Sequence, residues 1–157
     1  MDLTRALTIY YTMALLHISF RDVAWLQAFP LTRDTVLDYL SLSPFWDRAS
    51  TNDMLKMQQR HTNNPTPLSS EGIARQLEQM TSGVEFVVVA PKEDTGSMYV
   101  VHKRRRLRPG PSQSATILMA VIVVVADGNA YLAPPLTDVV QARLWGAVGA
   151  LLEAARY

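Results

Sequence analysis

The chain has 157 residues, enough for one domain with a substantial hydrophobic core. Its formal net charge of +1 is far from the basic excess of a dedicated nucleic-acid-binding protein, and the absence of cysteine excludes disulfides, thiolate metal sites and cysteine nucleophiles. With 48 % hydrophobic and 18 % charged residues, the composition leaves room for an apolar surface that a partner covers.

An apolar segment opens the chain at residues 3–16. We do not expect a signal peptide, because Asp2 offsets Arg5 and no small-residue cleavage site follows. The segment is also shorter than the roughly 20 residues that span a bilayer. Because its apolar positions cover more than one helical face, we expect residues 1–17 to form a docking helix that packs against the domain or a neighbouring protein.

Short helices separated by turns are predicted for residues 18–60. Residues 18–29 read as a short strand or extended entry and a brief helix with Ser19 as its cap. The next helix begins near Thr32 and stops before Pro44, and a further helix with Ser50 and Asn52 as possible caps follows at once. The two aromatic residues after Pro44 are either core residues, which is the commoner case, or a recognition site.

The spacing of the apolar residues changes from a helical to an extended pattern near residue 84. Before it, an amphipathic helix begins at Ser70 and ends at Gly83. After it, two runs rich in β-branched and aromatic residues, 84–90 and 98–103, predict a hairpin.

A second hairpin is predicted from residues 117–126 and 130–133, because Asp127 and Gly128 supply a turn signal between them. The near-continuous apolar run of its first strand indicates burial on both faces, so helices should cover at least one face of the sheet. A last helix, residues 137–157, is expected to pack on this sheet. The predicted fold is therefore α+β, with a helical N-terminal half, an antiparallel sheet of about four strands in two hairpins, and a closing C-terminal helix.

The strongest local charge follows the second predicted strand, at Lys103, Arg104, Arg105, Arg106 and Arg108. This basic run could bind an acidic partner, a nucleic-acid backbone or a nuclear import receptor. It can equally be a solvated strand end whose charges prevent edge-to-edge aggregation. No aromatic residues interleave with it, which disfavours a platform for stacking single strands.

Catalytic and metal sites find no support in the pattern. None of the three histidines, His17, His61 and His102, lies at ligand spacing from another, and neither a phosphate-binding loop nor a serine nucleophile elbow occurs. Asp34 and Asp38 share a helical face, but this spacing usually marks a solvent-facing side. We therefore expect no enzyme, no metal and no cofactor.

Three strings together resemble a known family. They are I-S-F-R-D-x-x-W-L at residues 18–26, V-L-D-Y-L-S-x-S-P-F-W-D-R-A-S-T-N-D-M-L-K-M-Q at residues 36–58, and A-Y-L-A-P-P-L at residues 130–136. This combination resembles subunit six of the Mediator complex, a family of the head module, which bridges gene activators to RNA polymerase II. The resemblance begins near Ile18, so residues 18–157 are expected to form a single domain of this family.

The resemblance implies a non-catalytic nuclear scaffold that holds head-module subunits together and relays contacts to RNA polymerase II, with middle-module subunits as further candidate partners. Neither a membrane nor a specific nucleic acid is expected as a partner. The alternative is a nucleic-acid-binding module that uses the basic run. Family members typically carry a further C-terminal tail, so roles placed in that tail are not expected of the residues up to Tyr157.

The residues expected to contact partners are Trp25, Phe45, Trp46, Asp47, Arg48, Asn52, Lys103, Arg104, Arg105, Arg106, Tyr131 and Arg143. The three aromatic residues in this set that precede residue 50 are expected to form an apolar surface. The turn beside this surface is expected to be ordered by Asp47, Arg48 and Asn52. Four residues of the basic run should lie at its rim. Tyr131, Pro134 and Arg143 are motif residues, because in the family an arginine follows the Y-x-A-P element at this distance.

Overall fold

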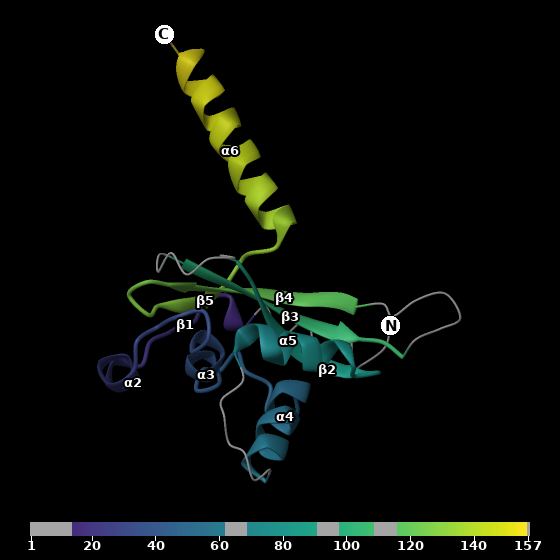
Figure 1. Ribbon diagram of the computed structural model, residues 1–157. Helices are drawn as coiled ribbons and strands as arrows, with labels where there is room; N and C mark the ends of the chain where they lie inside the picture. Colours follow the sequence, from purple (N-terminus) through teal and green to yellow (C-terminus); the bar gives the residue numbers. More distant parts are fainter. Residues whose placement is uncertain (1–13, 62–68, 91–97, 109–115, 157) are drawn as a thin grey trace.

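The computed structural model describes residues 14–61, 69–90, 98–108 and 116–156 (Figure 1). They adopt an α+β fold whose five strands form one antiparallel sheet of order β1-β5-β4-β3-β2, which confirms the predicted fold class. In chain order, the elements are β1 (Ser19–Phe20), α2 (Val23–Ala28), α3 (Val36–Leu40), α4 (Thr51–Arg60), α5 (Ser70–Glu78), β2 (Gly83–Ala90), β3 (Met98–Arg106), β4 (Thr116–Val125), β5 (Ala130–Leu132) and α6 (Leu136–Ala154).

The sheet contains both predicted hairpins, β2 with β3 and β4 with β5. β3 also pairs with β4, and the short strand β1 pairs with β5 and becomes the fifth strand. Gly128 in the β4–β5 turn has a φ of +88°, a conformation that glycine adopts without strain. The Asp127 carboxylate supports the turn by accepting a hydrogen bond from the Asn129 backbone N–H at 2.9 Å.

The hydrophobic core lies on one face of the sheet. Figure 1 shows α2, α3 and α4 on one side of the sheet, as expected for helices that cover a face. Alternate strand residues point into this layer, because side chains along a strand alternate between its faces. The core includes Val36, Leu37, Tyr39, Leu40, Phe86, Val88, Tyr99, Val101, Ile122 and Val124.

The predicted N-terminal docking helix lies mostly outside the described residues. Within them, Leu15 is buried in the core and Leu16 packs against it.

Tyr39 joins α3 to two other parts of the molecule. Its hydroxyl donates a hydrogen bond to the Gly128 carbonyl at 2.7 Å and accepts one from the Asp22 backbone N–H at 3.0 Å. Burial raises the pKa of the Tyr39 hydroxyl above its usual value, which keeps it protonated as a donor. Asp22, rather than Ser19, caps α2, since its carboxylate accepts from the Trp25 N–H at 3.0 Å.

Asn52 fastens α4 to β2, which is an edge strand of the sheet. Its side-chain amide donates to the Phe86 carbonyl at 2.9 Å and accepts from the Phe86 N–H at 2.8 Å. These two bonds satisfy backbone groups on the edge that a further strand would otherwise pair. Asn52 therefore does not cap the helix, and Ser50 occupies the N-cap position without a side-chain hydrogen bond.

The final helix α6 leads away from the sheet in Figure 1 and buries none of its residues. The expectation that this helix packs on the sheet is therefore wrong. Pro135 gives a physical reason, because its extended backbone, with φ of −56° and ψ of 148°, carries the chain out of the sheet before the helix begins.

Candidate protein-interaction surface

The expected aromatic surface is wrong at two of its three residues. Phe45 and Trp46 are 3 % and 9 % exposed and belong to the core. Trp46 stacks on Phe86 with the ring centroids 4.1 Å apart, and its indole N–H donates to the Asp53 carboxylate at 3.2 Å. Trp25 is half-buried against Tyr39, with the ring centroids 4.9 Å apart. The core interpretation of the aromatic pair after Pro44 is thus the one the structure supports.

Asp47 orders the turn before α4, as the sequence suggested. Its carboxylate accepts from the Ala49 N–H at 3.0 Å, and its carbonyl accepts from the Ser50 N–H at 3.0 Å. Arg48 lies between these residues and is exposed. The turn therefore holds Arg48 at the surface, whereas the Asn52 side chain bonds to the backbone of the edge strand β2.

Glu85 changes the interpretation of the basic run. Its side chain is 1 % exposed on β2, and its carboxylate accepts from Arg104 Nε at 2.5 Å and from Arg106 Nε and Nη2 at 3.1 Å each. Ion pairs of this kind satisfy the charges they bury. Two of the expected rim arginines are therefore structural partners of one buried carboxylate.

Of the remaining members of the basic run, one contacts a carboxylate and two are exposed to solvent. Lys103 Nζ lies 3.7 Å from the Asp47 carboxylate, while Arg105 and Arg108 are exposed. The expectation that the basic run lies at the rim of a partner surface is therefore wrong for Arg104 and Arg106, which bind Glu85 instead. The carboxylates of Glu85 and Asp47 also offset part of the local charge that the nucleic-acid alternative requires.

The largest apolar exposure that the structure describes is on α6. Leu136 and Trp145 are 77 % and 73 % exposed, and further large apolar residues of the helix are exposed as well, namely Val140, Leu144, Val148, Leu151 and Leu152. Trp145 and Leu152 each follow a member of the predicted stripe, about 100° further around the helix. The signal missed at the sequence level is that α6 is apolar on more than one face. No helix among the described residues has the length and apolarity needed to cross a membrane.

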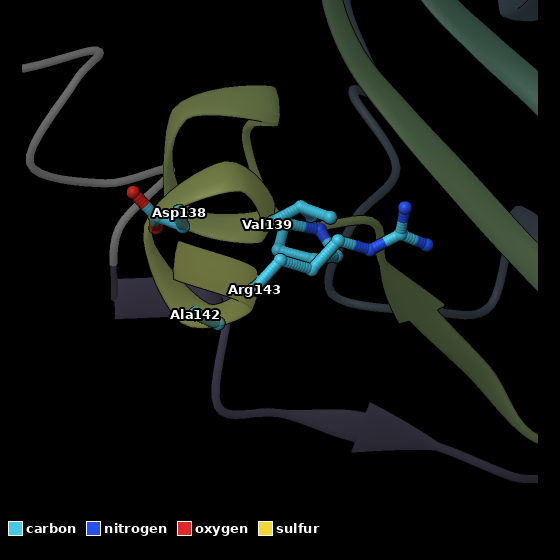
Figure 2. Close-up of a pocket in the computed structure, with 5 residues that line it drawn as sticks. Asp138, Val139, Ala142 and Arg143 are labelled. Atoms are coloured by element: carbon cyan, nitrogen blue, oxygen red, sulfur yellow. The ribbon is translucent and has the colours of Figure 1, made fainter. Parts of the chain in front are cut away.

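A hollow of about 540 Å³ lies at the base of α6, lined by Pro134, Asp138, Val139, Ala142 and Arg143. Figure 2 shows the Arg143 side chain extending away from the helix, with the Asp138 carboxylate on the other side. Two of the motif residues, Pro134 and Arg143, thus line the same hollow. Tyr131, the third, is exposed on β5.

The titratable groups in the described part of the chain do not gather into a metal site. Burial lowers the pKa of the His102 imidazole, and the nearby Arg104 guanidinium lowers it further, so His102 is neutral at pH 7. Asp38 forms an ion pair with Lys56 at 2.7 Å. Across the described ranges, no group of three His, Asp or Glu residues could hold a metal ion.

Comparison with known proteins decides the family. Residues 18–156 match the family described as MED6 mediator sub complex component. The chain belongs to the Mediator subunit 6 family. Two curated relatives in it, both named "Mediator of RNA polymerase II transcription subunit 6", come from Yarrowia lipolytica, at 34 % identity over 81 % of this chain, and from Mycosarcoma maydis, at 38 % identity over 79 %.

The fold agrees with this family. The solved structure of the Schizosaccharomyces pombe Mediator subunit Med6 superimposes with a TM-score of 0.63 at 27 % identity, covering 90 % of this chain and 93 % of that one. The chain spans about half the length of the curated relatives it matches, 53 % for the Yarrowia lipolytica protein and 47 % for the Mycosarcoma maydis protein. The sequence match and the fold thus agree on the Mediator subunit 6 family.

Proposed function

We propose that this chain is a non-catalytic scaffold subunit of Mediator in the nucleus, which holds head-module subunits together and relays contacts to RNA polymerase II. The observation that carries the proposal is the exposed apolar helix α6. A helix that is apolar all round is normally buried, and such a helix gains most of its stability from the elements that pack on it.

The chemistry of α6 indicates what kind of surface covers it. Leucine, valine and tryptophan side chains dominate the helix, and its charged residues, Asp138, Arg143 and Glu153, are few. Interfaces with an apolar centre and a few charges at the rim are typical of stable protein assemblies. Trp145 lies near the middle of α6 and belongs to the residue types that often dominate binding energy. We therefore propose that helices of a neighbouring Mediator subunit pack on α6.

The test is to replace Leu144 and Trp145 by glutamate and to measure assembly. The tagged chain is purified from nuclear extract, and the partners are identified by mass spectrometry; affinity for the recovered subunits is then measured with purified proteins. The loss of a single hot-spot contact costs about 2 kcal/mol or more, which is about 30-fold in affinity, so the double variant should weaken assembly by at least that factor.

The matched control is Gln141→Glu, which adds a negative charge to α6 without removing apolar surface. Both variants should keep the circular dichroism spectrum and unfolding temperature of the sheet domain, because α6 buries none of its residues. If the double variant assembles with undiminished affinity, α6 is not the docking element. If the unmodified chain recovers no Mediator subunit, the scaffold function itself is wrong.

A further inference from the structure

A second surface, remote in sequence from α6, combines apolar and cationic side chains. It is a hollow of about 570 Å³ between α3 and α4, lined by Asp38, Ser41, Leu42, Arg48, Asp53, Lys56, Met57 and Arg60. We call it the α3–α4 groove. Its volume lies within the range typical of ligand-binding clefts.

The α4 helix contributes one complete face to this groove. Residues 53, 56, 57 and 60 follow the spacing i, i+3, i+4, i+7, which places them along one side of a helix. The core-facing side of α4 carries the buried residues Asn52 and Leu55 instead. The groove residues are therefore not the ones that hold α4 on the sheet.

Two apolar side chains in the groove are exposed. Leu42, just after α3, is 51 % exposed, and Met57, on α4, is 62 % exposed. An isolated exposed apolar residue is ordinary, but these two come from different elements and line one hollow. An unbranched methionine adapts its shape to an incoming apolar side chain.

The charges of the groove are unequally compensated. Asp38 binds Lys56 at 2.7 Å, and Asp53 accepts the indole N–H of Trp46 at 3.2 Å. Arg48 and Arg60 are exposed, and no carboxylate of the described residues forms a salt bridge with either. The groove therefore offers two guanidinium groups together with an apolar surface.

We propose that the α3–α4 groove binds an acidic amphipathic helix of another protein. The apolar side chains of that helix pack on Leu42 and Met57, and its carboxylates pair with Arg48 and Arg60, which is the helix-in-groove mode of recognition. A nucleic-acid backbone fits less well, because Asp38 and Asp53 lie in the same groove and repel phosphates. The proposal concerns a surface separate from α6 and does not depend on the scaffold function.

The test uses the full chain and a fluorescently labelled peptide, designed as a helix with leucines on one face and glutamates beside them. Binding is measured by fluorescence anisotropy at low and high salt. The double variant Arg48→Glu, Arg60→Glu should lower affinity about tenfold or more, and added salt should weaken the unmodified complex. The matched control Arg75→Glu, Arg105→Glu makes the same change in net charge at exposed arginines outside the groove and should leave affinity unchanged.

Three further measurements separate the proposed mode from simpler ones. A peptide with lysines in place of the glutamates should bind the Arg48→Glu, Arg60→Glu variant better than it binds the unmodified chain. Met57→Ala should weaken binding of the glutamate peptide without changing the unfolding temperature, since Met57 is largely exposed. A scrambled peptide of the same composition should bind at least tenfold more weakly.

Specific outcomes would overturn the proposal. Equal binding of the designed and scrambled peptides would mean that charge alone is responsible. Equal losses in the groove variant and the control variant would mean that the groove is not the site. If duplex DNA binds more tightly than the peptide, and this binding depends on Arg48 and Arg60, the ligand of the groove is a nucleic acid and not a helix.

Discussion

Glu85 shares its buried carboxylate between Arg104 and Arg106, and this arrangement carries the first prediction. Glu85→Ala removes the only carboxylate that the structure shows binding the Arg104 and Arg106 guanidinium groups at the β2–β3 pair, among the described residues. Breaking a buried ion pair from one side destabilises strongly, so we expect the free energy of unfolding to fall by about 3 kcal/mol in urea titrations. Glu78→Ala, at an exposed position of α5, should change it by less than about 0.5 kcal/mol. Similar effects of the two substitutions would contradict the structural role assigned to Glu85.

The same residue shows what sequence patterns convey and what they omit. The basic run was visible as a string, and the strands on either side of it were predicted from their composition. Its compensation by Glu85 depends on the β2–β3 register, in which Glu85 lies opposite Arg104. Residues distant in sequence meet there, and no local spacing encodes the contact. A single carboxylate within an apolar strand was the signal available, because such a charge requires a partner when it is buried.

At the scale of elements, the contact between α4 and β2 depends on Asn52. Asn52→Ala leaves the Phe86 N–H and carbonyl without their side-chain partner in a buried region, so we expect a loss of about 1–3 kcal/mol in the free energy of unfolding. The Phe86 amide should also exchange its hydrogen faster, as measured by NMR. Asn129→Ala, in the β4–β5 turn and remote from β2, serves as a comparison that leaves the Phe86 amide protected. Unchanged exchange at Phe86 in Asn52→Ala would show that another group satisfies the strand edge.

The helices and strands themselves were predictable because propensity, turn residues and prolines agree locally. Pro44 and the turn after it were expected, and so was the departure of Phe45 and Trp46 from the helix. The expectation that both side chains form a partner-binding surface is wrong, because a turn determines where side chains leave a helix and not which surface lies opposite them. In the structure, Phe86 of β2 fills that place and stacks on Trp46. An interaction across two elements decided the question.

At the scale of the whole molecule, α6 reverses the expected layering. An apolar stripe at helical spacing predicts a covered face, and the natural cover within one chain was the sheet. The structure leaves that face exposed, so the prediction that the sheet covers it is wrong. We propose, as above, that another subunit covers it. A prediction made from one chain assigns every apolar face to the core of that chain. Such a prediction fails where a second protein in a complex covers the face.

The last prediction tests this layering in the isolated chain. Removing residues 136–157 should change the free energy of unfolding of the sheet domain by less than about 0.5 kcal/mol, because α6 buries no residue against it. The truncated chain should also self-associate less, since it lacks Leu136 and Trp145, which are the most exposed large apolar side chains among the described residues. Calorimetry gives the first quantity, and light scattering after size-exclusion chromatography gives the second. A loss of stability of about 2 kcal/mol or more would mean that α6 folds back on the sheet in solution, and the exposed helix could not then be the docking element.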